Sequence, residues 1–165
     1  MNQRPIPLIE VNAESISPYG KLLALPDGQP TIARGDIDYY HHIADSNDFT
    51  AHPVTSYLIS HPRTLLLEKI ERHRQTEETF IPLNGSSVMV LGKPGPLEEI
   101  ELVAIHLDGS FGIQLYRDTW HYAPFAIDDR ATYLLLSGKD SGPDIEIRDV
   151  TARPIAQPHA EEVNA

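Results

Sequence analysis

The sequence predicts an all-β protein, a sandwich or barrel built from short strands. One observation is the frequency of chain breaks: fourteen prolines and ten glycines divide the 165 residues, and proline ends helices while glycine weakens them. A second is the composition of the segments between these breaks, which are rich in β-branched, aromatic and leucine residues. The third is the spacing of these segments, roughly 8–12 residues, which is typical of sandwiches and barrels.

Six segments carry the strand pattern. In two of them, at residues 100–105 and 111–116, apolar and polar residues alternate, so one face of each strand is more apolar than the other. Residues 63–74 fit two patterns, because Leu66, Leu67 and Ile70 also lie at helical spacing. The six predicted strands are 53–60, 79–83, 88–91, 100–106, 111–116 and 132–137.

A single domain is expected, since 165 residues suffice for one hydrophobic core. Residues 1–150 are predicted to form this domain, a single β-barrel. Residues 151–165 contain Pro154 and Pro158 and end in a polar, acidic stretch, which predicts a loose C-terminal tail.

Composition excludes several classes of protein. The formal net charge is −11, which disfavours binding to the phosphate backbone of nucleic acids. The chain has no cysteine, which excludes disulfides, thiol catalysis and cysteine-based metal sites. Its apolar runs are too short to span a bilayer, and its first residues lack the apolar stretch of a signal peptide. We therefore expect a soluble cytoplasmic protein that binds neither nucleic acids nor membranes.

Two of the eight histidines, His73 and His121, have surroundings that suggest chemistry. On a strand, Glu71 and His73 are two residues apart and project to one face. A turn then brings Glu78 onto a returning strand that ends at a strong Asn-Gly turn signal. Two carboxylates and an imidazole are expected to converge inside the barrel, and His121 follows at the end of a later strand.

This spacing resembles the first motif of the cupin superfamily, in which His-x-His is followed by a Glu and, after six residues, by a Gly. Glu71 stands at the position of the first His, while His73, Glu78 and Gly85 fall at the spacing of the motif. His121 resembles the single His of the second cupin motif. The resemblance implies a cupin-type jelly-roll β-barrel, in which residues 63–74 form a strand.

A longer series of matches, from residue 17 to residue 139, is similar to the ureidoglycolate lyase family. This resemblance implies a cupin-fold, generally homodimeric lyase that splits ureidoglycolate into glyoxylate and urea during allantoin degradation, a part of purine metabolism. The matching blocks are Ser17-Pro18-Tyr19-Gly20, Tyr40-His41, Glu71-Arg72-His73, Phe80-Ile81-Pro82-Leu83 and Trp120-His121.

The chain departs from the family pattern at several positions. Glu78 stands where family members commonly have Gln, and Tyr116 and Tyr122 stand where they commonly have His. Residues 137–140, Ser-Gly-Lys-Asp, replace an Asp-Arg-Gly stretch. These changes bear on the substrate rather than on the fold, so a similar small carboxylate is an alternative substrate.

The implied reaction needs a base for the hydroxyl proton of the substrate and an acid for the departing nitrogen. An unperturbed imidazole has a pKa of about 6.5, so the histidines of this set, His73 and His121, are of the residue type suited to proton transfer near neutrality. Glu71 or Glu78 is the expected partner, because two inward carboxylates in a partly dry barrel raise the pKa of one of them. The sequence leaves open which of the four groups is the acid and which is the base.

The carboxylate of the substrate needs a cation or a hydrogen-bond donor. Arg72, Arg117, Tyr116 and Lys139 are the candidates for this substrate-binding role. A guanidinium can bind a carboxylate with two parallel hydrogen bonds. Strand alternation, however, turns Arg72 to the face opposite Glu71 and His73, where an ion pair or an interface is expected.

Glu71, His73, Glu78 and His121 also form a set of metal donors. Two imidazoles and two carboxylates suit Mn, Fe, Ni or Zn. Two other interpretations remain for the barrel, since one fold hosts many functions. It could be a different metal-dependent cupin enzyme, such as an isomerase or a dioxygenase, or a noncatalytic cupin that binds a small ligand. In the noncatalytic case the four side chains would form a buried, satisfied polar network.

Overall fold

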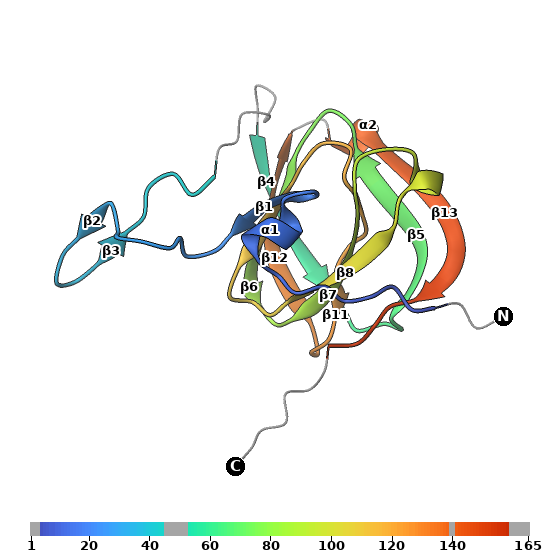
Figure 1. Cartoon of the computed structure of the whole chain (residues 1–165), viewed down its shortest axis with the longest axis horizontal. Helices are drawn as coiled ribbons and strands as arrows, with labels where there is room; N and C mark the ends of the chain where they lie inside the picture. The colour runs from blue at the N-terminus through green and yellow to red at the C-terminus, as the bar shows by residue number, and fades with distance from the viewer. Residues whose placement is uncertain (1–3, 45–52, 139–140, 159–165) are drawn as a thin grey trace, which may run out of the picture.

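The computed structural model describes residues 4–44, 53–138 and 141–158, and these residues form an all-β fold (Figure 1). Its strands are antiparallel and build two main sheets. In chain order they are β1 (Gly20–Leu23), β2 (Ile32–Ala33), β3 (Asp38–Tyr39), β4 (Pro53–Ser60), β5 (Leu66–His73), β6 (Glu78–Asn84), β7 (Ser87–Gly92), β8 (Leu102–Leu107), β9 (Gly112–Leu115), β10 (Trp120–His121), β11 (Phe125–Ala126), β12 (Ala131–Gly138) and β13 (Ile145–Pro154).

The two main sheets have a crossed strand order. One sheet runs β1-β9-β6-β12-β4, and the other runs β11-β7-β10-β5-β13 with β8 paired to the side of β7. The chain therefore passes from one sheet to the other between β5 and β6, and this arrangement is the jelly roll that the sequence predicted. The crossing brings the last residues of β5 close to the first residues of β6.

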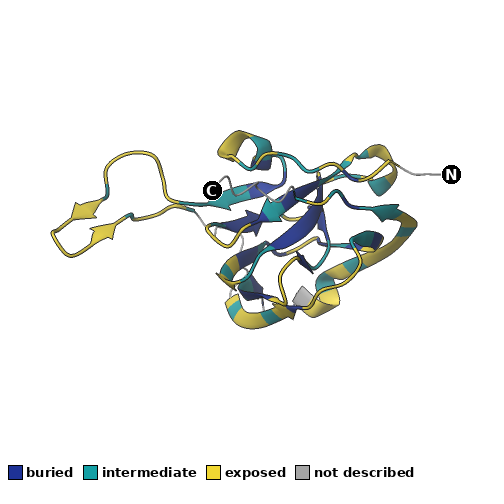
Figure 2. Cartoon of the chain, turned by 90° about the horizontal axis from the view of Figure 1, so that it is seen from below, coloured by how far each residue is buried: buried dark blue, intermediate teal, exposed yellow. Residues whose placement is uncertain are grey.

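The core lies between the sheets. The strands alternate, so that one face of each contributes to it: Phe80, Leu91, Ile113 and Tyr133 are among its buried side chains. A second apolar cluster lies on the other face of β7 and includes Val88, Val90 and Trp120, with Ile6 and Ile155 packed among them. Figure 2 shows the strands between these clusters as buried, while the outlying segments are exposed.

The predicted strands are confirmed, with ends that differ by one or two residues. Residues 66–73 of the ambiguous segment form a strand rather than a helix. In the part of the chain that the structure describes, the helices are α1 (Ala13–Ile16), the 3-10 helix η1 (Leu97–Glu99) and α2 (Ser141–Asp144). Among the described residues, no helix has the length and apolar character needed to cross a membrane.

The ordered sheet extends beyond residue 150, where the sequence analysis placed the start of a loose tail. β13 continues to Pro154 because it pairs with β5 on both sides of a register shift between Asp149 and Arg153, and Ile155 is buried and bridges to Ile6. Apolar residues beside the two prolines thus keep this segment on the barrel. Residues 159–165 of the predicted tail lie outside the described residues.

A hairpin formed by β2 and β3 projects from the barrel as an arm (Figures 1 and 2). The arm leaves the barrel after β1, and every residue from 31 to 39 is exposed. The sequence analysis did not predict these two strands, because glycine and proline flank them closely.

Candidate active site

The inner face of β5 presents Glu71 and His73 to the barrel interior, as the two-residue spacing predicted. Glu71 lies directly opposite His121 of the neighbouring strand β10 in the sheet register. The side chain of His73 is 8% exposed and that of Glu71 19% exposed. Both residues are thus held by a regular strand ladder rather than by a loop.

The crossing from β5 to β6 places Glu78 beside them. The hydroxyl of Thr76, which is buried, accepts a hydrogen bond from the backbone N–H of Gly138 at 2.8 Å, and this contact anchors the crossing to the end of β12. The backbone N–H of Gln75 donates to Asp144 at 2.8 Å. Glu78, the first residue of β6, then starts its strand on the inner face.

His121 is positioned by the turn that precedes β10. The backbone N–H of Asp118 donates to the carbonyl of His73 at 2.7 Å, and the Thr119 hydroxyl donates to the carbonyl of Tyr19 at 2.8 Å. These bonds tie the turn to β5 and to the segment before β1. The imidazole of His121 is 2% exposed, and the edge of its ring meets Phe80 in a T-shaped contact.

The four predicted catalytic side chains converge. Nε2 of His121 lies 3.1 Å from Oε2 of Glu78, and Nε2 of His73 lies 3.7 Å from the same oxygen. Oε1 of Glu71 lies 4.0 Å from Nε2 of His121. The rings of His73 and His121 are 5.7 Å apart and tilted by 32°. Glu78 is therefore the centre of the cluster, and Glu71 lies at its rim.

Both nitrogens of His121 face hydrogen-bond acceptors. Nδ1 donates to the carbonyl of Thr119 at 2.9 Å, and Nε2 donates to the carboxylate of Glu78. A neutral imidazole has only one N–H, so this arrangement is satisfied when both nitrogens carry a proton. In this state His121 is a cation paired with the anionic Glu78.

The pKa shifts in the cluster follow from burial and from this ion pair. Burial alone would lower the pKa of His121, but the hydrogen bond and the charge of Glu78 outweigh burial and raise it above its ordinary value. Burial alone would likewise raise the pKa of Glu78, and the hydrogen bond from His121 brings it below the ordinary value.

The pKa of Glu71 is shifted in the opposite direction to that of Glu78. Burial raises its pKa, the nearby charge of His121 offsets a part of this effect, and the negative charge of Glu78 adds to it. Among the described residues, Glu71 lacks a close cationic hydrogen-bond partner, whereas Glu78 has one. Two neighbouring carboxyl groups thus have pKa values that are displaced in opposite directions, an arrangement typical of acid–base sites.

His73, Glu78 and His121 could hold a metal ion. One donor atom from each lies within 4.8 Å of the other two, and two imidazoles with one carboxylate are a common donor set for divalent transition metals. The hydrogen bond from Nδ1 of His121 to a backbone carbonyl is the outer contact that usually orients a metal-binding imidazole. Nδ1 of His73 is buried and has no hydrogen-bond partner among the described residues. The donor set therefore fits a metal, with the outer contact present for one imidazole.

Arg72 lies away from this cluster. Its guanidinium contacts Glu146 through two nitrogens at 3.0 Å, donates to the carbonyl of Gly95 at 3.0 Å, and stacks on the ring of Trp120, 4.2 Å from the ring centre. Asp118 lies 3.6 Å from it. These contacts occupy the guanidinium in the ion pair that strand alternation predicted, on the face of β5 opposite Glu71 and His73.

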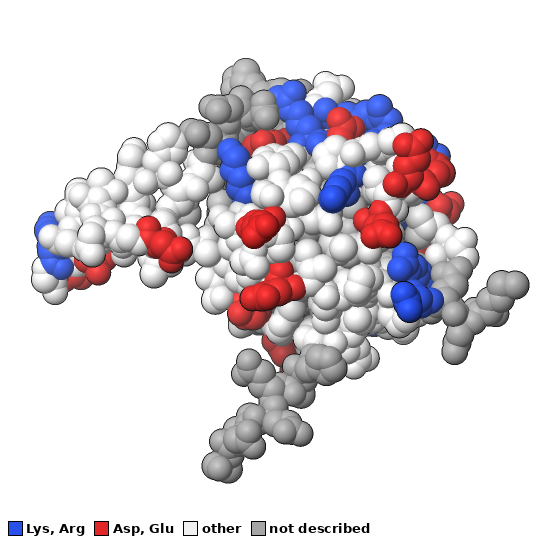
Figure 3. All heavy atoms as spheres, viewed as in Figure 1, with Lys and Arg blue, Asp and Glu red and all other residues white. Residues whose placement is uncertain are grey.

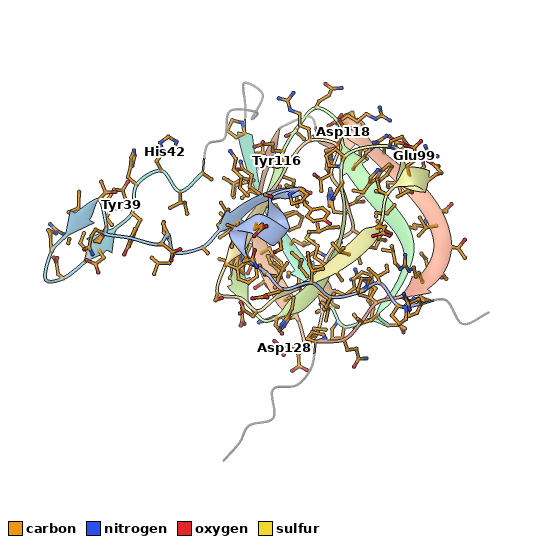
Figure 4. The ribbon with its side chains drawn as sticks, in the orientation of Figure 1. Tyr39, His42, Glu99, Tyr116, Asp118 and Asp128 are labelled. Carbon is orange, nitrogen blue, oxygen red and sulfur yellow. The ribbon has the colours of Figure 1, made fainter. Side chains whose placement is uncertain are left out.

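The other predicted substrate-binding residues follow β9 or β12. Tyr116 is half-buried and Arg117 is exposed, and Figure 4 shows Tyr116 at the same end of the barrel as Asp118. Lys139 lies outside the described residues. On the face that Figure 3 shows, Lys and Arg side chains are interspersed with Asp and Glu.

Sequence reasoning missed a buried polar pair beside the cluster. Glu77 is 3% exposed, and its carboxylate accepts a hydrogen bond from the amide of Gln114 at 2.7 Å. The available signal was the Glu77-Glu78 dipeptide at the start of a strand, since alternation turns neighbouring carboxylates to opposite sides and Glu77 therefore cannot share the partners of Glu78. The carbonyl of Thr119 was also missed, because every residue type has a backbone carbonyl and the sequence does not indicate which one accepts a hydrogen bond.

Comparisons with known proteins point to one family. A family model described as ureidoglycolate lyase matches residues 3–156. A ureidoglycolate lyase of Pseudomonas savastanoi pv. phaseolicola is 29% identical over 139 residues, 78% of this chain and 80% of that protein. Proteins of the same description from Azotobacter vinelandii and Pseudomonas fluorescens are 27% and 28% identical, over 80% and 94% of this chain and 89% and 99% of theirs.

Proposed function

The chain belongs to the ureidoglycolate lyase family, and from this premise we propose that its buried cluster cleaves ureidoglycolate into glyoxylate and urea. The observation that carries the proposal is the pair of carboxyl groups with opposite pKa shifts, Glu71 and Glu78, both close to Nε2 of His121. Such a pair supplies one group that holds a fixed charge and one group that can exchange a proton.

The reaction moves one proton between neighbouring atoms. In ureidoglycolate, a single carbon carries a hydroxyl, a carboxylate and a urea nitrogen. When the hydroxyl loses its proton, the electron pair of the O–H bond forms the carbonyl of glyoxylate, and the electrons of the C–N bond leave with the nitrogen. That nitrogen takes up a proton to give urea, so the reaction consumes and releases no net proton.

Glu71 is the group that we assign to this proton. Its raised pKa makes it a stronger base than an ordinary carboxylate and, once protonated, an acid able to return the proton. It is also the most exposed of the four side chains and lies at the rim of the cluster, 4.0 Å from His121. Glu71 thus takes the proton from the hydroxyl oxygen and delivers it to the departing nitrogen.

His121, Glu78 and His73 set the charge around Glu71. The cationic His121 stabilises the ionised form of Glu71, and it is itself held by Glu78 and by the carbonyl of Thr119. Alternatively, with His121 neutral and its Nε2 unprotonated, a metal ion held by His73, Glu78 and His121 would replace this ion pair, act as a Lewis acid and withdraw charge from an oxygen of the substrate. Mn, Fe, Ni and Zn suit these donors, and Glu71 is left free for proton transfer in either case.

The substrate carboxylate needs a partner of its own. Arg117 and the hydroxyl of Tyr116 are the candidates that we retain, because both follow β9 on the turn that leads to His121. Lys139 remains a candidate from the sequence alone. We extend the proposal to the role that the family resemblance implies, a step of allantoin degradation within purine metabolism, carried out in the cytoplasm.

The test is turnover of ureidoglycolate by the purified protein, with glyoxylate and urea measured separately. We expect the two products in equal amounts. His73→Ala and His121→Ala should remove most of the activity while the protein stays folded, and His61→Ala, at an exposed position outside the cluster, should leave it unchanged. Turnover of a different small carboxylate would instead support another cupin enzyme, and binding without turnover of any such compound would support a noncatalytic role.

Metal removal tests the second part of the proposal. We expect elemental analysis of protein purified without chelator to find close to one divalent transition-metal ion per chain, and His121→Ala to reduce this content severalfold. Chelation should also lower the thermal unfolding temperature, because a metal that binds only the folded state stabilises it. A metal-free protein with full activity after chelation would contradict the metal and leave the acid–base assignment of Glu71 standing.

A further inference from the structure

The turn between β9 and β10 contains a residue with an unusual backbone conformation. Asp118 has a φ of +62°, and His42 is the other non-glycine residue with a positive φ in the described part of the chain. A left-handed backbone is costly for residues other than glycine, and least so for Asn and Asp. Such strain persists where the surrounding structure enforces it, and it clusters at functional sites. Asp118 is three residues before His121 in the chain.

Four hydrogen bonds enforce the conformation of this turn. The backbone N–H of Thr119 donates to the carbonyl of Tyr116 at 3.2 Å, which closes a four-residue turn with Asp118 in third place. That place has a positive φ in type II turns, where glycine or asparagine usually fills it. The carbonyl of Tyr19 accepts from the N–H of Tyr116 at 3.0 Å and from the hydroxyl of Thr119 at 2.8 Å. The N–H of Asp118 donates to the carbonyl of His73 at 2.7 Å, so the turn is anchored on both sides of Asp118.

The backbone of Asp118 lies between hydrogen bonds to the two histidines of the cluster. Its own N–H holds the carbonyl of His73 at the end of β5, and the carbonyl of the next residue, Thr119, accepts from Nδ1 of His121 at 2.9 Å. The φ angle of Asp118 sets the direction of the second group relative to the first. A rotation from +62° to the negative φ that most residues adopt would turn the Thr119 carbonyl while the N–H of Asp118 stays in place. The left-handed φ therefore allows both bonds at once.

The side chain of Asp118 has a smaller part in this arrangement. Its carboxylate is 41% exposed and lies 3.6 Å from the guanidinium of Arg72, and an ion pair this open to solvent contributes little to stability. Arg72 is also held by Glu146 and by the carbonyl of Gly95, so it does not depend on Asp118. The backbone of Asp118, rather than its charge, is thus the feature that bears on the cluster.

We propose that Asp118 is a positioning residue of the active site, and that its left-handed backbone keeps His121 aligned with Glu78 and Glu71. The imidazole of His121 is 2% exposed and donates through Nδ1 to Thr119 and through Nε2 to Glu78. A displaced Thr119 carbonyl would either lose the first bond or draw the ring away from the second. A misplacement of about 1 Å can cost roughly 10²-fold in rate. The effect on turnover rests on the proposed function, whereas the placement of His121 does not.

Three substitutions of Asp118 separate the role of its backbone from that of its charge. Asp118→Gly and Asp118→Asn remove the charge and keep the left-handed φ accessible, so kcat for ureidoglycolate should stay within about threefold of the native value. Asp118→Val opposes this φ through its branched Cβ and should lower kcat at least about tenfold. KM should change by less than about threefold, because Tyr116 precedes Asp118 and keeps its own bond to Tyr19. A native kcat in Asp118→Val, or an equal loss in Asp118→Gly, would overturn the proposal.

A matched control places similar strain in a distant turn. Gly109, between β8 and β9, has a φ of +93°, and a Cβ there would lie 3.3 Å from the carbonyl oxygen of Gly85, which follows the end of β6 opposite Glu78. Gly109→Val should lower the thermal unfolding temperature as Asp118→Val does, but leave kcat unchanged. If circular dichroism shows that Asp118→Val is unfolded, Asp118→Ala opposes the same φ with a smaller side chain and should lower kcat at least about threefold. Equal losses of kcat in Gly109→Val and Asp118→Val would overturn the proposal.

The placement of His121 also has a readout that needs no turnover. In protein labelled with ¹⁵N-histidine, with any bound transition metal replaced by zinc, the Nδ1 proton of His121 should exchange slowly with water, because it is buried and bonded to Thr119. His121→Gln identifies this signal by its loss. The signal should persist in Asp118→Gly and should be lost, or exchange at least about tenfold faster, in Asp118→Val. A native protein without ureidoglycolate turnover would contradict the proposed function, whereas an unchanged signal in folded Asp118→Val would overturn the positioning role.

Discussion

The ionisable side chains on the two faces of strand β5 differ in how completely they are paired. On the outer face, the guanidinium of Arg72 is held by Glu146, by the carbonyl of Gly95 and by the ring of Trp120. On the inner face, Glu71 has no close hydrogen-bonded cation and its pKa is raised by burial, and Nδ1 of His73 has no partner among the described residues. A paired charge holds strands together, whereas an incompletely paired one remains available for proton transfer. Within one strand, Arg72 thus contributes to stability, whereas its neighbours Glu71 and His73 are available for chemistry.

The largest effect is expected on the inner face. Glu71→Gln removes the proposed proton carrier with little change in shape, and we expect a loss of kcat of roughly 10²–10⁴-fold. In the native enzyme, activity should fall as the pH drops through the raised pKa of Glu71, since the base is then protonated, and this acidic limb should be absent from the residual activity of the variant. The measurement is the dependence of kcat/KM on pH. A variant that keeps native turnover with the same acidic limb would assign the proton to another group.

A smaller effect on turnover and a larger one on stability are expected on the outer face. Arg72→Met leaves the carboxylate of Glu146 with fewer partners and removes the contact with Trp120, so we expect a loss of about 2–4 kcal/mol in the free energy of unfolding. Chemical denaturation measures this loss, and kcat should change by less than about tenfold.

Arg74→Met is the matched control for this prediction. Arg74 binds the same oxygen of Glu146 but is largely exposed, so its loss should change stability much less than the loss of Arg72. A large rise in KM for Arg72→Met with unchanged stability would contradict the comparison and return Arg72 to a substrate-binding role.

The smallest effect concerns acid stability. Hydrogen bonds from Arg74, Arg148 and Arg72 lower the pKa of Glu146 to about 2. Because the folded-state value lies below the unfolded value of about 4.3, the stabilisation is complete above the unfolded value and is lost as the pH falls through the folded one. Glu146→Gln should therefore lower stability near neutrality and flatten its decline in this acidic range, as measured by unfolding at a series of pH values. An unchanged decline would mean that other carboxylates dominate acid unfolding.

The sequence predicted the strands of the barrel better than its periphery. Strands β4 to β9 and β12 consist of apolar or alternating residues between glycine and proline, and such patterns are local. β13 has similar alternation in Ile145-Glu146-Ile147, but prolines follow it, and its continuation depends on pairing with β5. The β2–β3 arm contains only two-residue strands, Ile32–Ala33 and Asp38–Tyr39, on either side of Gly35, so its hairpin was not visible as a pattern.

The candidate site shows a similar division. The convergence of Glu71, His73, Glu78 and His121 was predicted from strand alternation and from the family resemblance, and alternation also predicted that Arg72 faces away. What could not be predicted is how each group is paired. The bond from His121 to the carbonyl of Thr119, for example, involves the backbone, and the opposite pKa shifts of the two carboxyl groups depend on differences of about one ångström in their distance from His121.

One consequence of the Gly95 carbonyl concerns protein engineering. Residues 93–96 form a short loop between β7 and η1 and would look like a convenient place to insert a tag or a binding peptide. Gly95 adopts a φ of +143°, a conformation open to glycine alone, and its carbonyl accepts hydrogen bonds from both Arg72 and Trp120. Trp120 immediately precedes His121, so an insertion here would disturb the packing behind the strand that carries His121. The exposed residues of the β2–β3 arm are the safer choice for fusion.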